Sequence, residues 1–116
     1  MSSFPLSPLV IGASGGIGAA IADALDRKRS VTRLSRRGDG LDITDEGSVA
    51  RAAARFKDQR FDLIVVATGV LESAGARPEK SFAEIDAGAM ARVFAANAIG
   101  PALIAKHFAP LLPAKE

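Results

Sequence analysis

Three kinds of side chain are missing from this sequence, which contains no cysteine, no tryptophan and no tyrosine. Without cysteine, these residues cannot form a disulfide, a thiolate nucleophile or a cysteine-ligated metal site. Without tyrosine, they cannot supply a phenolic acid or base. Histidine occurs once, as His107, and one histidine among scattered carboxylates gives no metal-binding pattern. We therefore predict no metal site, and we favour a structural role for His107 over a catalytic one.

Strong charge of one sign and long apolar runs are also absent. The 15 basic and 13 acidic residues give a formal net charge of +2, which is too balanced to indicate a nucleic acid or an acidic membrane surface as a partner. No run reaches the roughly 18 apolar residues of a membrane-spanning helix, and the first ten residues lack the pattern of a secretory signal. We therefore expect a soluble cytoplasmic domain with neither nucleic-acid nor membrane partners.

The hydrophobic residues, 48% of the 116, are arranged in alternating strand and helix patterns. Four segments have the pattern of strands, namely residues 8–11, 30–34, 41–43 and 61–67. Three segments have the pattern of helices, namely residues 17–27, 44–56 and 82–112. The last strand is apolar without alternation, as in a parallel strand buried on both faces. The last helix contains Gly100-Pro101, which predicts a kink near its middle.

The order of these segments predicts the fold class. Strands that alternate with helices form an open parallel sheet with crossover connections. We predict a single α/β domain over residues 1–116, a Rossmann-type three-layer sandwich with strand order 3-2-1-4. A doubly wound fold has two halves, and this chain corresponds to the first of them.

A glycine-rich turn joins the first strand to the first helix, with the sequence Gly12-Ala13-Ser14-Gly15-Gly16-Ile17-Gly18. At this place in a parallel sheet, such a turn lets backbone N–H groups and the helix N-terminus approach a pyrophosphate. The spacing, Gly12-x-x-x-Gly16-x-Gly18, differs from the commoner G-x-G-x-x-G fingerprint. The turn predicts dinucleotide binding, and a tight turn without a ligand is the alternative.

The end of the second strand indicates which dinucleotide binds. An acidic residue there would bond the ribose hydroxyls of NAD, but this chain has Ser35-Arg36-Arg37. Guanidinium groups at this position favour the 2′-phosphate of NADP, with NAD as the other possible cofactor. The alternative is that both arginines belong to a solvated basic surface with their neighbours Arg27, Lys28, Arg29 and Arg33.

Four motifs together resemble the short-chain dehydrogenase/reductase family. They are the glycine turn, Asp42-Ile43 after the third strand, Ala67-Thr68-Gly69 after the fourth, and Asn97-x-x-Gly100 in the long helix. The stretches Gly69-Val70-Leu71, Pro78 to Ser81 and His107-Phe108 further resemble the C-factor-type branch of that family. The resemblance implies hydride transfer between a nicotinamide cofactor and a carbonyl or alcohol substrate, in an enzyme that forms homo-oligomers.

The resemblance also implies the roles of individual residues. In the glycine turn, the pyrophosphate and ribose would be held by Gly12, Ser14, Gly15, Gly16, Ile17 and Gly18. Arg36 would bind the 2′-phosphate, Asp42 and Ile43 the adenine, and 67–69 would line the cleft. Asn97 resembles the asparagine whose main-chain carbonyl holds a water in the proton relay. Pro101 lies four residues after Asn97 and has no N–H, so this carbonyl lacks its normal α-helical donor.

The sequence also departs from the family pattern. Ala67-Thr68-Gly69 lacks the asparagine common at this strand end, and the family's catalytic Ser and Tyr-x-x-x-Lys have no counterpart in these residues. We therefore expect the chain to be part of a longer protein, inactive alone, with Leu63 to Val66 on an unpaired sheet edge. The alternative is a non-catalytic module that binds a dinucleotide and acts through a partner.

Overall fold

Three parallel strands form the centre of the domain in the computed structural model, which describes residues 6–68 and 82–113. The strands are β1 (Ser7–Ile11), β2 (Thr32–Leu34) and β3 (Phe61–Val66), and their order in the sheet is β2-β1-β3. The predicted α/β class with a parallel sheet is therefore confirmed.

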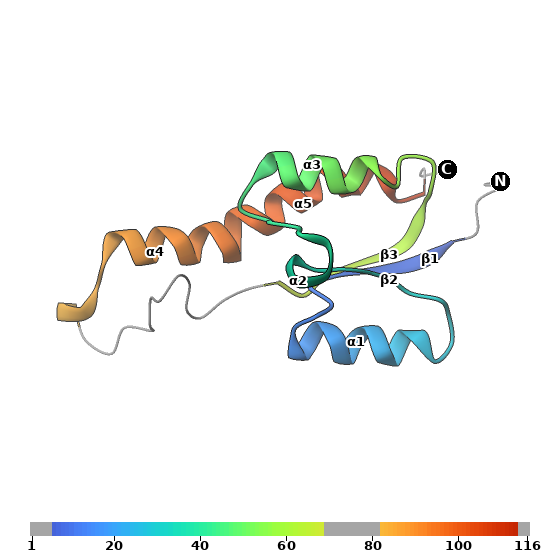
Figure 1. Cartoon of the computed structure of the whole chain (residues 1–116), viewed down its shortest axis with the longest axis horizontal. Helices are drawn as coiled ribbons and strands as arrows, with labels where there is room; N and C mark the ends of the chain where they lie inside the picture. Colours follow the sequence, from blue (N-terminus) through green and yellow to red (C-terminus); the bar gives the residue numbers. More distant parts are fainter. Residues whose placement is uncertain (1–5, 69–81, 114–116) are drawn as a thin grey trace.

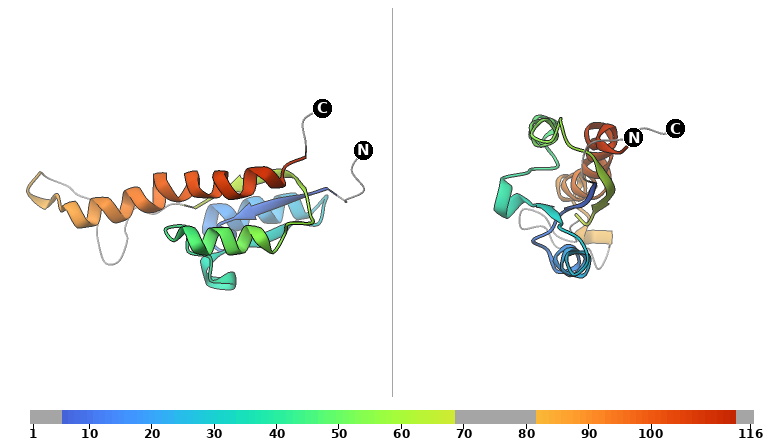
Figure 2. Two further views of the ribbon diagram at one scale, coloured as in Figure 1. Left: turned by 90° about the horizontal axis from the view of Figure 1, so that it is seen from above. Right: turned by 90° about the vertical axis from the view of Figure 1, so that its right-hand side faces the viewer.

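Helices cover both faces of the sheet. One face carries α1 (Gly16–Asp26), and the other carries α3 (Glu46–Ala54) and α5 (Gly100–Phe108) (Figure 1; Figure 2, right). Strand β1 supplies both cores because its side chains alternate between the faces: Leu9 and Ile11 pack under α3 and α5, whereas Val10 packs against Ala22 of α1. Burial on both faces explains why this strand is an uninterrupted apolar run.

The predicted third strand is wrong, so the observed sheet contains strands 2, 1 and 4 of the predicted order but no strand at residues 41–43. Leu41 is buried in the core beneath α3, as a strand residue would be. However, the backbone N–H of Leu41 donates to the Ser35 carbonyl, and the N–H of Asp42 donates to Ser48 Oγ at 2.9 Å. These bonds use the donors that pairing with a neighbouring strand would need.

After β2 the chain forms a short helix, α2 (Arg36–Asp39), which ends at Gly40 in the left-handed conformation (φ 67°). Its first residues are fixed by Ser35, whose hydroxyl accepts a bond from the Gly38 N–H at 2.8 Å. The chain leaving β2 therefore turns sharply back toward the sheet.

The long C-terminal helix is interrupted near the predicted place but in a different way. It consists of α4 (Ala87–Phe94), the π-helical segment η2 (Ala95–Ile99) and α5, with the 3₁₀ turns η1 (Phe82–Glu84) before it and η3 (Ala109–Leu111) after it. Pro101 follows the π segment and occupies the first turn of α5, where its missing N–H is best tolerated. The wider π turn is how this helix accommodates the proline.

Helix α4 extends beyond the sheet, as Figures 1 and 2 show, and large apolar side chains on it and on η2 are exposed, including Phe94 (60%) and Ile99 (55%). By length and composition alone, the continuous helix Ala87–Leu111 is long and apolar enough to cross a membrane. Ile104 and Phe108 of this helix are each 1% exposed in the core under the sheet. The α5 part of this helix therefore packs in the core of the folded domain.

One cluster of charges joins the start of α3 to the end of α5. Glu46 Oε2 accepts hydrogen bonds from Lys106 Nζ at 2.6 Å and lies 2.8 Å from His107 Nε2. The bond from Lys106, followed by the contact with His107, lowers the pKa of the Glu46 carboxyl below its usual 4.5. His107 thus has a structural contact, in agreement with its predicted role.

We expect Glu46→Gln to lower the melting temperature at neutral pH by at most about 3 °C, since exposed ion pairs contribute little. A carboxyl with a lowered pKa stabilises the fold fully above its unfolded value and loses that contribution as the pH falls through the folded value. The difference from wild type should therefore vanish on acidification below pH 4.5, as followed by circular dichroism. Asp58→Asn, at an exposed aspartate, is the control, and a pH-independent difference for Glu46→Gln would contradict the ion pairs.

Candidate functional site

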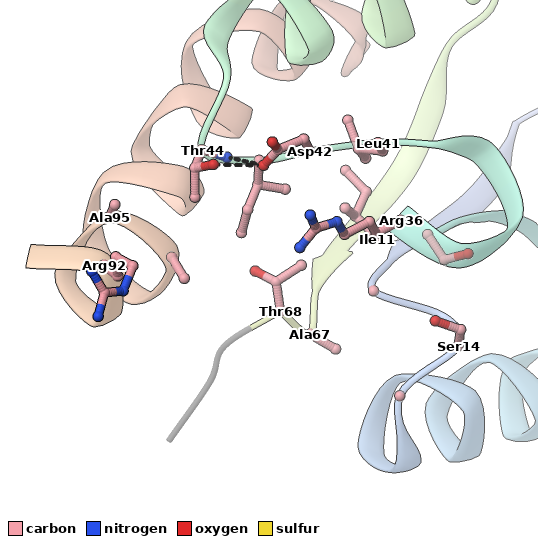
Figure 3. A pocket seen from close by; sticks show the side chains of 15 residues that line it. Ile11, Ser14, Arg36, Leu41, Asp42, Thr44, Ala67, Thr68, Arg92 and Ala95 are labelled. Carbon is pink, nitrogen blue, oxygen red and sulfur yellow. Dashed lines mark hydrogen bonds between the residues drawn. The ribbon is translucent and has the colours of Figure 1, made fainter. Parts of the chain in front are cut away.

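A cavity of about 620 Å³ opens at the carboxyl ends of the strands, between the sheet and α4. In open parallel sheets, ligands bind at this end of the strands, and the volume lies in the range of small-molecule sites. Figure 3 shows residues from the glycine turn before α1, from α2, from the segment before α3, from the end of β3 and from the α4–η2 helix arranged around it. The lining residues are Ile11, Gly12, Ser14, Gly15, Ser35, Arg36, Leu41, Asp42, Ile43, Thr44, Ala67, Thr68, Arg92, Ala95 and Ala96.

The glycine turn forms one wall, and two of its glycines are required by close packing. Gly12 has φ +92°, and a Cβ on it would lie 2.7 Å from the Ala67 carbonyl oxygen. A Cβ on Gly18 would lie 1.9 Å from the Gly12 carbonyl oxygen. Only glycine allows α1 and the end of β3 to approach the turn this closely. By contrast, a Cβ on Gly16 would meet nothing within 4 Å.

The start of α1 presents backbone donors beside the cavity. Gly15 is the N-cap residue and makes no side-chain cap bond, and the first turn of α1 contains no acidic side chain. N–H groups at a helix N-terminus favour negative charge, and the glycines at positions 15 and 16 leave them accessible. This wall fits a phosphate or pyrophosphate.

The second wall comes from the end of β2 and from α2. Ser35 is held through its hydroxyl at the N-cap of α2 and through its backbone N–H, which donates to Asp39 Oδ2 at 2.9 Å. This places Arg36 on the cavity wall, where Figure 3 shows its guanidinium near the centre of the site. Arg37 is not among the lining residues. Of the two predicted arginines, the structure therefore brings only Arg36 to the cavity.

Asp42 lies on the same wall as an ionised carboxylate. Its Oδ1 accepts hydrogen bonds from Thr44 Oγ1 at 2.6 Å and from the Thr44 N–H at 3.0 Å. These two bonds, with a smaller contribution from the Arg36 guanidinium, lower the pKa of Asp42 below its usual 3.8. The carboxylate is thus a fixed acceptor for an amino group on a ligand, such as that of adenine.

The structure brings nine of the fifteen predicted site residues together around the cavity. They are Gly12, Ser14, Gly15, Ser35, Arg36, Asp42, Ile43, Ala67 and Thr68. Ile17 is 75% exposed, and Gly16 and Gly18 lie in α1, outside the lining set. The prediction for Gly69 falls outside the described residues.

Asn97 lies in the π-helical segment η2 and does not line the cavity, although its neighbours Ala95 and Ala96 do. It takes part in a polar interaction in this structure. In an α-helix the Asn97 carbonyl would face Pro101, four residues later, which has no N–H. In a π turn the carbonyl instead faces the residue five positions later, Ala102, which does have an N–H. The structure therefore does not support the prediction that the Asn97 carbonyl lacks a donor. The role of Asn97 in a proton relay stays a prediction.

Sequence reasoning missed the contribution of α4 and η2 to the cavity. Arg92, Ala95 and Ala96 all line it. Ala95 and Ala96 follow Arg92 by three and four residues, which puts all three on one face of a helix. This pattern of one basic and two small residues was the feature of the sequence that could have predicted their place on the cavity wall. Leu41 and Thr44 were also missed as lining residues, although their neighbours Asp42 and Ile43 were predicted.

The residues around the cavity fit a dinucleotide. The glycine-rich turn, the helix N-terminus and Arg36 suit phosphate groups, and Asp42 suits an adenine amino group. Among the described residues, no group of three or more His, Asp or Glu side chains could hold a metal ion. The fold and site thus define a Rossmann-type unit with a cavity that suits a dinucleotide.

Comparison with solved structures extends this assignment. A "small-chain dehydrogenase" matches with a TM-score of 0.77 and 30% identity, over 93% of this chain and 49% of the other. A structure of a small-chain dehydrogenase in complex with NADPH matches equally well over 46% of its length. A carbonyl reductase from Pseudomonas aeruginosa is 26% identical, with a TM-score of 0.76, over 93% of this chain and 57% of its own. No protein-family model and no curated protein matches the sequence.

The chain belongs to the short-chain dehydrogenase/reductase family, and it fits the N-terminal half of its relatives. It spans about half the length of the solved structures that it matches. The predicted family is therefore confirmed, whereas the resemblance to the C-factor-type branch stays a prediction.

Proposed function

We propose that the protein is an oxidoreductase that transfers a hydride between a nicotinamide cofactor and a carbonyl or alcohol carbon of a small molecule. These residues would supply its cofactor-binding half. The observation that carries the proposal is the cavity, where the glycine turn and the Arg36 guanidinium face the same space. The NADPH complex of the 30% identical dehydrogenase supports a nicotinamide cofactor for this site.

We propose NADP rather than NAD as the preferred cofactor. Arg36 offers a guanidinium fork that suits a 2′-phosphate. Asp39, which follows the end of β2 closely, is engaged inside α2, where its carboxylate accepts a bond from the Ser35 N–H. Asp39 is also not among the residues that line the cavity, so its carboxylate is not placed to bond the ribose hydroxyls, the interaction that favours NAD.

The residues of this chain would bind and orient the cofactor, which supplies the hydride acceptor or donor when bound. The N–H groups at the start of α1 would hold the pyrophosphate, Arg36 the 2′-phosphate, and Asp42 with Ile43 the adenine. Because the 116 residues include no tyrosine, the phenolic acid/base that the family resemblance implies would come from outside them. We propose that the chain alone binds the cofactor without turnover and that the complete enzyme is a homo-oligomer.

A second candidate function is a module that binds a dinucleotide and acts through a partner. It is favoured by the combination of a formed cofactor cavity and the absence of tyrosine. Both functions require dinucleotide binding, so turnover separates them. A version of the protein extended to the length of the solved relatives should oxidise or reduce simple alcohols or carbonyls if the protein is an enzyme.

Calorimetric titration of the protein with NADP⁺, NAD⁺ and 2′,5′-ADP tests the proposal. We expect NADP⁺ and 2′,5′-ADP to bind, and NAD⁺ to bind at least about tenfold more weakly, since the charge-assisted hydrogen bonds between Arg36 and the 2′-phosphate are lost. Equal affinities for the two dinucleotides would contradict the preference for NADP. No binding of either dinucleotide would contradict both candidate functions.

A further inference from the structure

Gly100 lies where the π-helical segment η2 meets α5, and its backbone conformation does not require glycine. Its φ of −56° and ψ of −54° are those of an ordinary right-handed helix, and its N–H donates to the Ala95 carbonyl. Glycine inside a helix is less favourable than alanine, because it loses more conformational freedom on folding. The missing side chain at this buried position must therefore be explained by the packing around it.

The space that a side chain at Gly100 would need is occupied by Ile43. A Cβ on Gly100 would lie 2.7 Å from Ile43 Cδ1 and 2.9 Å from Ile43 Cγ1. Carbon atoms that are not bonded to each other normally stay about 3.5 Å or more apart. Ile43 also packs against the core that α5 helps to form. Its side chain thus rests on the backbone of the long helix, and it can do so only because residue 100 is glycine.

The segment that carries Ile43 depends on contacts of this kind, because it is not a strand of the sheet. Leu41 anchors the segment in the core, and the Asp42 N–H donates to Ser48 Oγ at 2.9 Å, which attaches it to α3. The contact between Ile43 and Gly100 attaches it to the long helix. Together these contacts fix where Asp42 and Ile43 lie on the cavity wall.

Gly100 supports two walls of the cavity without lining it. Ile43 lines the wall formed by the segment before α3, and Ala95 lines the wall formed by the long helix. Gly100 contacts Ile43 through its open Cα face and bonds the Ala95 carbonyl through its N–H. The placement of the two walls relative to each other therefore depends on the size of residue 100.

We infer that Gly100 is a positioning residue for the adenine end of the site, acting through Ile43. The inference rests on the proposed function, in which Asp42 and Ile43 bind the adenine. A methyl group at position 100 would force the Ile43 side chain away by about 1 Å to restore ordinary contact. The core behind Ile43 is close-packed, whereas the cavity on its other side is open. Ile43 would therefore move into the space that the adenine needs.

Gly100→Ala tests the inference in calorimetric titrations with NADP⁺ and with 2′,5′-ADP, which contains the adenine but no nicotinamide. We expect both ligands to bind about tenfold more weakly, since the displaced Ile43 side chain narrows the adenine end of the cavity. The variant should still fold, with a melting temperature within about 5 °C of wild type by circular dichroism. The atoms that must move belong to one side chain, and alanine favours the helix more than glycine does.

A double-mutant cycle shows whether the effect acts through Ile43. Ile43→Ala removes both atoms that the new methyl group would meet. Adding Gly100→Ala to this variant should therefore change the affinity for 2′,5′-ADP by less than about twofold. Gly88→Ala is the matched control, because it makes the same change in α4, where a Cβ would approach only the ends of two flexible side chains at 3.4 Å. It should bind 2′,5′-ADP as wild type does.

The outcomes separate the inference from the proposed function. If wild type binds NADP⁺ and Gly100→Ala binds it equally well, the inference is overturned and the function stands. The inference is likewise overturned if Gly100→Ala weakens binding by the same factor with and without Ile43→Ala, or if Gly100→Ala does not fold, because the glycine would then serve the fold as a whole. If wild type binds neither dinucleotide, the proposed function fails and the inference fails with it.

Discussion

Gly18→Ala is expected to destabilise the protein by about 3 kcal/mol or more, a large loss for a domain of this size. The added Cβ would lie 1.9 Å from the Gly12 carbonyl oxygen and 3.3 Å from Ala67 Cβ. The first of these atoms is backbone and cannot rotate away, so α1 would have to move from the turn. Because the turn is a wall of the cavity, NADP⁺ binding should be lost as well. Chemical denaturation measures the first effect and calorimetry the second.

Gly16→Ala is the matched control for this prediction. It adds the same methyl group two residues earlier in the same helix, where a Cβ would meet nothing within 4 Å. Both positions are helical, so the intrinsic gain of up to about 1 kcal/mol from replacing glycine applies to both. We therefore expect Gly16→Ala to fold with wild-type stability or better. Similar stabilities for the two variants would contradict the close approach of Gly12 and Gly18.

The parts of the fold that could be predicted from sequence are those fixed by local patterns. Strands β1 and β3 are apolar runs with clear ends, and the glycine turn after β1 has a strong local signature. Its placement beside Arg36 and Asp42 follows from the general rule that parallel strands end at one edge of a sheet. These elements sufficed to predict the parallel sheet and the residues at the carboxyl ends of its strands that line the cavity.

The parts that could not be predicted depend on contacts between separate segments of the chain. Leu41 to Ile43 has the apolar pattern of a strand, but the N–H of Asp42 is taken by the Ser48 hydroxyl from the next helix. The π-helical segment before Pro101 depends on how the whole long helix packs, which the position of one proline does not determine. The same is true of Arg92, whose place on the cavity wall depends on how α4 lies relative to the strand ends. Contacts between distant segments leave little trace in a single sequence.

Arg36→Ala is expected to weaken NADP⁺ binding about 100-fold while changing NAD⁺ affinity by less than about threefold. Two charge-assisted hydrogen bonds from a guanidinium to a phosphate account for a change of that size. A second effect acts in the same direction. The hydrogen bonds from Thr44 lower the pKa of Asp42 more than Arg36 does, so Asp42 stays ionised in the variant. Without the guanidinium to offset it, this carboxylate would repel a 2′-phosphate. NAD⁺ has no such phosphate and should be much less affected.

Calorimetry with both dinucleotides at two salt concentrations measures this effect and its origin. Arg36→Lys keeps the positive charge but loses the planar fork, so its NADP⁺ affinity should fall between those of wild type and Arg36→Ala. Arg51→Ala removes an exposed arginine of α3 that lies outside the cavity lining and makes a 3.9 Å ion pair with Asp45, and this variant should bind both ligands as wild type does. Equal losses of NADP⁺ and NAD⁺ affinity in Arg36→Ala would show that this side chain shapes the cavity and does not bind the 2′-phosphate. The selective loss, combined with a salt dependence that is weaker in the alanine variant, would assign the phosphate contact to Arg36.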